Sequence, residues 1–326
     1  MKSVRTRRWS RTAVAVLTGV LTLGLVACGS SSDDASEGGG GSTTIAHTYG
    51  ETTVDGTPKR IVALGNQWLD ALQSLGVTPV GYIDNVAVLS KSAPAWEPES
   101  LQSAKSLNSQ GNLVEEVANL EPDLILADAF IATQKNYDDL SQIAPTLPGL
   151  TKEAVTPWQD QVRALGKVLH KTEDADTVVN DLTTRIDGIA AKYPGLQGKT
   201  FVSSWLSGPT QLMVLTDPKD ASSQLFTQLG MSIPTHLTEQ GGNGGRLALS
   251  PERLNELDSD LLLAGYSPGM DEKFRQLPGY NELPSVQQDA IVFLTLQEIS
   301  AINQPTPLAL PYLLDKLEPA LANAAK

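Results

Sequence analysis

The sequence predicts an α/β protein of two Rossmann-like lobes, each with a central parallel sheet, joined by a long rigid α-helix. Three observations predict this class. Short apolar runs alternate with helix-like stretches along the chain, which is typical of parallel sheets. Two short segments of the first half of the sequence have similar counterparts in the second half. Between the halves lies a long stretch whose apolar residues keep helical spacing.

The chain begins with the pattern of an export signal that ends in a lipidation site. A basic head precedes the apolar stretch 13–27, which is shorter than the about 20 residues that a membrane-spanning helix needs. A Leu-Val-Ala-Cys run ending at Cys28 matches the bacterial lipobox, and Cys28 is the only cysteine. We therefore predict a lipoprotein signal peptide at 1–27 and acyl chains on Cys28, which hold the protein at the extracytoplasmic face of the cell membrane. The pair Arg7-Arg8 leaves Sec and twin-arginine export both open.

Residues 28–44 are rich in Gly, Ser, Asp and Glu and are predicted to be a flexible tether. The signal holds five basic and no acidic residues, so its removal changes 24 minus 37 into 19 minus 37, a net charge of −18. Such a charge argues against nucleic acid and against an anionic lipid surface, so the membrane is reached through the anchor alone. Without further cysteines, the fold is stabilised without disulfides.

The folded part contains seven short apolar runs that we expect to be strands. The runs at 124–127 and 261–264 are apolar without alternation, which predicts central strands covered on both faces. We assign 45–155 to an N-terminal lobe and 195–326 to a C-terminal lobe. The other runs lie at 61–64, 80–83, 201–203, 213–216 and 291–294.

The segment 156–194 is predicted to connect the lobes as helix. Thr156 and Pro157 offer an N-cap and a proline at the first helical position. A helix from Glu173 to Tyr193 would be about 31 Å long at 1.5 Å per residue. This length favours a stiff connection over a flexible hinge.

Two internal sequence similarities support the two-lobe prediction. LEPDLILA at 120–127 returns as LDSDLLLA at 257–264, a separation of 137 residues. A helix end at 75–77 has a counterpart at 229–231, a separation of 154. Because the separations differ, the halves share a plan and are not a strict repeat.

Five segments of the folded part carry a resemblance to a known family. They are TPKRIVAL at 57–64, LGVTPVG at 75–81, NLVEEVANLEPDLIL at 112–126, LSQIAPT at 140–146 and NQPTPLALPYLL at 303–314. Together these segments resemble the helix-linked (class III) substrate-binding lipoproteins of ABC importers, the group that serves ferric siderophores, heme and cobalamin. The resemblance covers nearly the whole mature chain. It implies a monomer that binds its ligand between two lobes and delivers it to an ABC permease.

Ligands of α/β lobes contact the loops that follow the carboxyl ends of strands. Aromatic residues gather at those positions in a chain with only 5% aromatics, and an arginine after the glycine-rich loop 241–245 offers a forked donor to the oxygen atoms around a metal. Packing in a lobe core is the alternative for each ring, and a solvated surface position is the alternative for the arginine. The predicted ligand-binding residues are Trp68, Tyr82, Trp96, Phe130, Trp205, Arg246 and Tyr266.

The sequence offers no catalytic group and no resident metal or cofactor. The glycine-rich loop lacks the Gly-Lys-Ser/Thr of a P-loop, and no nucleophile elbow is present. The histidines His47, His170 and His236 lack the spacing of metal ligands. Iron would therefore arrive already chelated, and the protein is predicted not to be an enzyme.

The resemblance also implies two docking residues. In the family, an acidic residue on the surface of each lobe pairs with arginines of the permease. The matching positions are Asp70, where the family usually has Glu, and Glu252. Glu252 also lies in the first turn of a helix that Ser250 caps, where an acid suits the helix dipole.

The predicted ligand is a ferric siderophore of hydroxamate type. A hydroxamate complex is neutral or weakly charged, so one arginine and aromatic walls suffice. A triscatecholate is anionic and calls for several basic residues, whereas the loops offer few besides Arg246 and Lys91. The alternatives are heme, with Tyr266 or Tyr82 as axial ligand, cobalamin, a surface enzyme that acts on a chelate, and an adhesin-like or regulatory lipoprotein.

Overall fold

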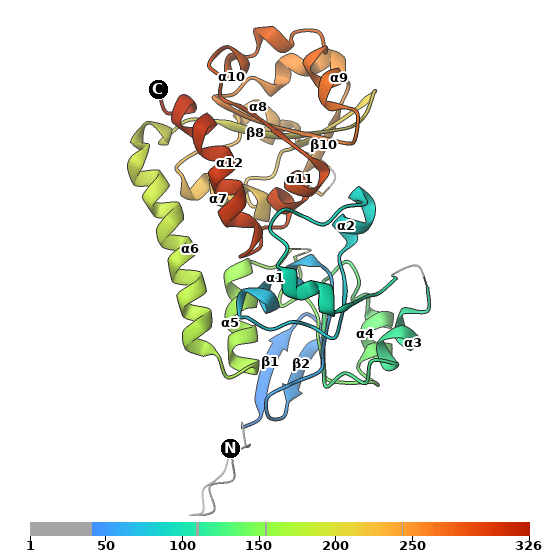
Figure 1. Ribbon diagram of the computed structural model, residues 1–326. Coiled ribbons are helices and arrows are strands. Elements are labelled where there is room, and N and C mark those ends of the chain that lie inside the picture. Colours follow the sequence, from blue (N-terminus) through green and yellow to red (C-terminus); the bar gives the residue numbers. More distant parts are fainter. Residues whose placement is uncertain (1–40, 109–110, 154, 243) are drawn as a thin grey trace, which may run out of the picture. The chain divides into compact units, whose positions relative to one another are not determined.

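A computed structural model describes residues 41–326 except 109–110, 154 and 243 (Figure 1). The predicted signal peptide 1–27, Cys28 and most of the predicted tether lie outside the described residues. The tether prediction runs slightly too far, because strand β1 (Thr43–His47) begins before residue 45. β1 pairs in antiparallel register with β2 (Gly50–Val54), and the Thr44 and Thr53 hydroxyls lie 2.8 Å apart across this hairpin.

The first sheet has five parallel strands in the order β5-β4-β3-β6-β7, and the part of the chain around it is the N-lobe. In β3, Ile61 and Ala63 face one hydrophobic core, while Val62 and Leu64 face another. Both faces of the sheet are therefore covered, as the apolar runs predict. The strands are β3 (Ile61–Leu64), β4 (Gly81–Ile83), β5 (Lys105–Ser106), β6 (Leu124–Ala127) and β7 (Thr146–Leu147).

The second sheet, the centre of the C-lobe, is mixed and has the order β10-β9-β8-β11-β12. β8, β11 and β12 are parallel, but β9 is antiparallel to both its neighbours, so the prediction of a fully parallel sheet is wrong here. Residues 209–210 alone separate β8 from β9, which makes a hairpin and leaves no room for a crossover helix. The strands are β8 (Phe201–Gly208), β9 (Gln211–Leu215), β10 (Arg246–Leu249), β11 (Leu261–Tyr266) and β12 (Ile291–Leu294).

The connecting segment is helical as predicted and consists of two helices, the second of which matches the predicted helix 173–193 to within one residue. α5 (Trp158–Val168) packs against α1 (Asn66–Ser74) of the N-lobe, and α6 (Thr172–Lys192) follows after a break that includes His170 at φ +54°. α6 is the 21-residue yellow-green helix in Figure 1, and it contacts α5, α7 and α12. The N-cap prediction for Thr156 is wrong, because its hydroxyl accepts a hydrogen bond from Leu150 N at 3.3 Å instead.

The similar segments 120–127 and 257–264 make the same backbone contact in each lobe. Asp123 and Asp260 lie 137 residues apart, each directly before a strand whose first four residues are fully buried, β6 and β11. Asp123 accepts hydrogen bonds from the backbone N of Lys59 and Arg60 at 2.7 and 2.8 Å, just before β3. Asp260 accepts one from Thr200 N at 2.7 Å, just before β8. In each lobe a carboxylate thus ties the starts of two paired parallel strands together.

Helices cover both sheets, and no described helix is both long and apolar enough to cross a membrane. In the N-lobe these are α2 (Asn85–Ser90), η1 (Glu99–Ser103), α3 (Leu113–Ala118) and α4 (Gln134–Leu140). In the C-lobe they are η2 (Pro194–Leu196), α7 (Ala221–Gln228), α8 (Thr235–Gln240), η3 (Pro251–Leu257), α9 (Asp271–Arg275), η4 (Tyr280–Glu282), α10 (Pro284–Gln287), α11 (Leu296–Asn303) and α12 (Ala309–Ala324).

Candidate ligand-binding site

The buried carboxylate of Asp128 organises the loops at one edge of the N-lobe sheet. Asp128 follows β6 and accepts hydrogen bonds from the backbone N of Gln67 and Trp68 at 3.1 and 3.3 Å, so it caps α1 from a neighbouring strand. Gly65 has φ +117°, and a Cβ there would overlap this carboxylate, so the position requires glycine. Burial raises the pKa of Asp128 to about 7, although the two N–H groups oppose the rise.

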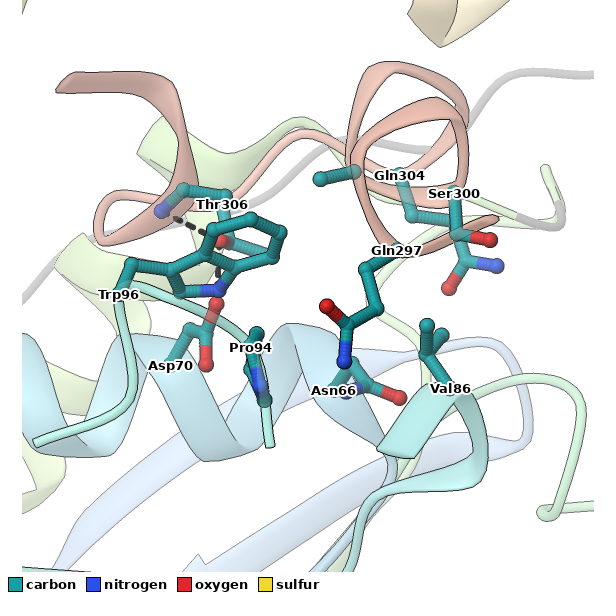
Figure 2. Close-up of a pocket in the computed structure, with 11 residues that line it drawn as sticks. Asn66, Asp70, Val86, Pro94, Trp96, Gln297, Ser300, Gln304 and Thr306 are labelled. Atoms are coloured by element: carbon teal, nitrogen blue, oxygen red, sulfur yellow. Dashed lines mark hydrogen bonds between the residues drawn. The ribbon is translucent and has the colours of Figure 1, made fainter. Parts of the chain in front are cut away.

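One pocket is lined from both lobes (Figure 2). The ring of Trp96 lies beside Asp70 and Thr306, and the Thr306 hydroxyl donates a hydrogen bond to the Asp70 carboxylate. Elsewhere between the lobes, Gln297 Nε2 donates to the carbonyl oxygen of Ser92 at 2.6 Å. These contacts join the N-lobe to α11 and to the start of α12. The lining residues are Asn66, Asp70, Val86, Pro94, Trp96, Gln297, Ser300, Ala301, Gln304, Thr306 and Ala309.

The structure contradicts the docking role predicted for Asp70. This residue is only 7% exposed, and its carboxylate faces Thr306 of the other lobe. Burial raises the pKa of Asp70 to about 7, hydrogen bonds from Thr306 and Trp96 oppose the rise, and the charges of Asp84 and Asp128 add to it. A side chain enclosed in this way cannot reach a permease surface, so Asp70 is a contact between the lobes.

A second pocket lies in the C-lobe and brings Trp205 and Arg246 together. Trp205 stands on β8, and its buried indole Nε1 has no hydrogen-bond partner among the described residues. Arg246 begins β10, and its guanidinium donates to the Asp220 carboxylate at 2.7 and 3.3 Å and to Asn303 Oδ1 at 3.2 Å. The pocket therefore places an indole ring beside a guanidinium that is already paired. Its lining residues are Ser203, Ser204, Trp205, Met213, Leu215, Arg246, Ile299 and Asn303.

Two further pockets share lining residues with each other. Phe130 is 57% exposed and lines a pocket of the N-lobe with Tyr49, Lys152 and Glu153. Glu153 also lines a wider pocket, whose other wall comes from the C-lobe loop before α7. That wall includes Asp217, Lys219 and Asp220, and Asp220 leads directly to Arg246. The pockets from Phe130 to Trp205 are thus connected only through their lining residues: the first two share Glu153, and the Asp220–Arg246 pair links the second to the C-lobe pocket.

Three predicted ligand residues lie outside these pockets. Trp68 has no exposed surface and belongs to the main hydrophobic core, so its ligand role is contradicted. Tyr82 packs against the same core, and burial raises its pKa. Tyr266 packs on Phe293 with ring centroids 6.3 Å apart, and burial raises its pKa as well. The two tyrosines are therefore poor candidates for a ligand wall or an axial ligand of heme.

The second predicted docking residue, Glu252, is exposed in the first turn of η3. Its backbone N donates to Ser250 Oγ at 3.4 Å, which confirms the predicted cap. Among the described residues, no group of His, Cys, Asp and Glu side chains is arranged to hold a metal ion.

The sequence matches the family model described as periplasmic binding protein over residues 61–297, more than half of the chain. The chain belongs to the periplasmic binding protein family. The family consists of solute-binding proteins, and this membership confirms the resemblance to substrate-binding proteins of ABC importers.

Known relatives and one solved structure support the assignment. The Fe(3+)-citrate-binding protein YfmC of Bacillus subtilis is 28% identical over 87% of this chain and 90% of its own length. The "Probable siderophore-binding lipoprotein YfiY" of the same organism is 27% identical over 76% of this chain and 75% of its own length. A periplasmic solute binding protein from Mycobacterium smegmatis superposes with a TM-score of 0.74 at 26% identity, over 88% of this chain and 99% of that one.

Sequence reasoning missed several residues of this binding protein's pockets, above all Asp220 and Asn303. Asp220 is the N-cap of α7. The local sequence Asp-Ala-Ser-Ser predicts a helix start. It does not predict that Asp220 pairs with Arg246, 26 residues further along the chain. Asn303 opens the segment NQPTPLALPYLL that carries part of the family resemblance. That position gave a sequence-level reason to consider it, although its contact with Arg246 depends on the tertiary fold.

Proposed function

We propose that the protein captures a ferric siderophore of hydroxamate type in the connected pockets from Phe130 to Trp205 and delivers it to an ABC permease. The observation that carries the proposal is the C-lobe pocket, where an aromatic ring lies beside an arginine whose charge Asp220 already balances. Such a site suits a bulky chelate with little net charge. Membership of a solute-binding family supports capture without turnover. A relative named for Fe(3+)-citrate and one named for siderophores support an iron chelate as the ligand.

The anchored location is part of the proposal. It is supported by the Leu-Val-Ala-Cys run, which matches a lipidation site at Cys28, and by a relative that is named as a lipoprotein. The protein would then work as a monomer at the extracytoplasmic face of the membrane.

A fluorescence titration tests the ligand class. Trp205 lines the C-lobe pocket, so a bound ferric chelate is expected to quench tryptophan emission. We expect ferrichrome and ferrioxamine B to bind tightly and to be recovered chemically unchanged. Arg246→Ala should weaken their binding at least about tenfold, because it removes an ordered guanidinium and leaves Asp220 unpaired. Binding of hemin or cobalamin alone would overturn the hydroxamate class, and conversion of the chelate would indicate an enzyme.

The docking pair is reassigned to Glu115 and Glu252. Their numbers differ by 137, which is also the separation between the LEPDLILA and LDSDLLLA segments and between Asp123 and Asp260. Glu115 is exposed in the first turn of α3, and its backbone N donates to Asn112 Oδ1 at 3.4 Å, just as Glu252 does to the Ser250 hydroxyl. One exposed acid thus occupies the same place in each lobe, which Asp70 does not.

Charge reversal tests this pair. We expect Glu115→Lys and Glu252→Lys each to slow chelate uptake by cells, and the double variant to slow it at least about tenfold, because interface charges set association. Affinity of the purified variants for the chelate should stay unchanged. Asp181→Lys, on an exposed position of α6, makes the same charge change away from both sites. Equal losses of uptake in this control and in the double variant would contradict the assignment.

A further inference from the structure

Asp220 lies beside Arg246 at the edge of the C-lobe pocket, where a carboxylate of a ligand would otherwise bind. Its Oδ2 lies 2.7 Å from Arg246 Nη1 and its Oδ1 lies 3.3 Å from Nη2, the two-point geometry that a guanidinium offers to carboxylates. Asp220 Oδ1 also accepts from the backbone N of Ser222 at 2.9 Å, at the start of α7. The two features that would attract an anion, a guanidinium and a helix N-terminus, are therefore both satisfied by the protein itself.

This internal pair is held firmly in the charged state. Burial alone would raise the pKa of Asp220, but hydrogen bonds from Arg246 and Ser222 outweigh it and hold that pKa below its ordinary value. The guanidinium is fixed on two further sides, since Nη2 lies 3.2 Å from both Ser222 Oγ and Asn303 Oδ1. The side chains of Arg246 and Asp220 are 25% and 22% exposed, so the pair borders the pocket.

The wider lining has no excess of positive charge to draw in an anion. Around the three connected pockets, three acidic side chains stand against three basic ones, so their net charge is zero. The rest of the mature chain is strongly acidic, which repels anions at longer range. The six side chains are Glu153, Asp217, Asp220, Lys152, Lys219 and Arg246.

We propose that Asp220 is the residue that selects the ligand by charge: it neutralises Arg246 from within, so the site accepts neutral and cationic ferric chelates and rejects anionic ones such as ferric dicitrate. This inference rests on the proposed function, because it assumes a ferric chelate in the same pockets. A carboxylate-bearing chelate would find the guanidinium occupied and would meet the negative charge of Asp220 itself. A neutral chelate needs only the polar edges of the pair and the aromatic ring of Trp205.

Asp220→Asn tests the proposal with little risk to the fold. Asparagine is as good an N-cap as aspartate, so α7 should begin at the same residue. The change leaves Arg246 with an unbalanced charge at the pocket. The matched control is Asp217→Asn, which removes a carboxylate from the same loop and the same pocket lining. Asp217 accepts a hydrogen bond from Lys219 N at 2.9 Å and makes no hydrogen bond to Arg246.

The measurement is the dissociation constant of each protein for ferrichrome, ferrioxamine B and ferric dicitrate at one salt concentration. Relative to ferrichrome, ferric dicitrate should gain at least about tenfold in affinity on Asp220→Asn and less than about threefold on Asp217→Asn. Equal gains in both variants would show a long-range field and overturn the proposal. So would an unchanged ratio in an Asp220→Asn protein that still binds ferrichrome. A wild-type protein that binds none of the three chelates overturns the proposed function itself, which is a distinct result.

Discussion

Trp68→Ala is expected to lower the free energy of unfolding by about 3–5 kcal/mol and to leave the chelate affinity of the folded protein unchanged. Trp68 has no exposed surface and lies on α1, which packs against β3 and α5 within the main core. Removal of the indole leaves a large cavity among well-packed side chains. Urea denaturation monitored by circular dichroism measures the loss, and titration with ferrichrome below the unfolding transition measures the affinity.

Trp68→Phe serves as the milder variant if the alanine protein does not fold. It keeps an aromatic ring in the core, and it removes an indole Nε1 that has no hydrogen-bond partner among the described residues. We therefore expect a smaller loss of stability than for alanine. Weaker chelate binding in Trp68→Phe without any loss of stability would instead support the ligand wall predicted from the sequence.

The contrast between Trp68 and Trp205 shows that a position just after a strand does not by itself predict that a side chain lines a pocket. Both residues follow or end a predicted strand, yet only Trp205 lines a pocket. Trp68, Leu72 and Leu75 keep the i, i+4, i+7 spacing of one helix face, and all three are buried. That pattern predicts a core position for Trp68, because a helix that starts two residues earlier turns this face back onto the sheet.

Arg246 illustrates a different limit. Arg246 and Trp205 were separate candidates in the sequence, and the structure brings them to one pocket. The charge of that site depends on Asp220, which the sequence did not single out. The strand register brings Arg246 and Asp220 together. Arg246 lies opposite Leu215 in the antiparallel β9–β10 ladder. Its side chain therefore reaches the loop that follows β9 and ends at Asp220. The predicted sheet contained a strand at 213–216 but not its antiparallel direction, and it lacked β10 altogether. A correct charge for the pocket therefore required the correct sheet topology.

Asp70→Asn is expected to remove a pH dependence of stability of about 4 kcal/mol. The pKa of Asp70 is about 7 in the folded protein against an ordinary 3.8, and each pH unit corresponds to about 1.36 kcal/mol. The folded protein thus binds this proton more tightly than the unfolded chain does. Stability should therefore be highest at about pH 4, fall as the pH rises to about 7, and stay level above it as far as Asp70 is concerned. Asparagine keeps the acceptor oxygen for Thr306, so the variant should be the more stable protein above pH 7.

The prediction is checked by urea denaturation at intervals from pH 4 to pH 8 for the wild type, Asp70→Asn and Asp55→Asn. Asp55 is an exposed carboxylate of the N-lobe, so its variant controls for the loss of one negative charge. Asp128, which also has a raised pKa of about 7 from burial, adds a slope of the same sign that remains in all three proteins. The difference between wild type and Asp70→Asn therefore isolates the contact between the lobes. Identical slopes in all three proteins would mean that water reaches Asp70, and the enclosed contact with Thr306 and Trp96 would then not persist in solution.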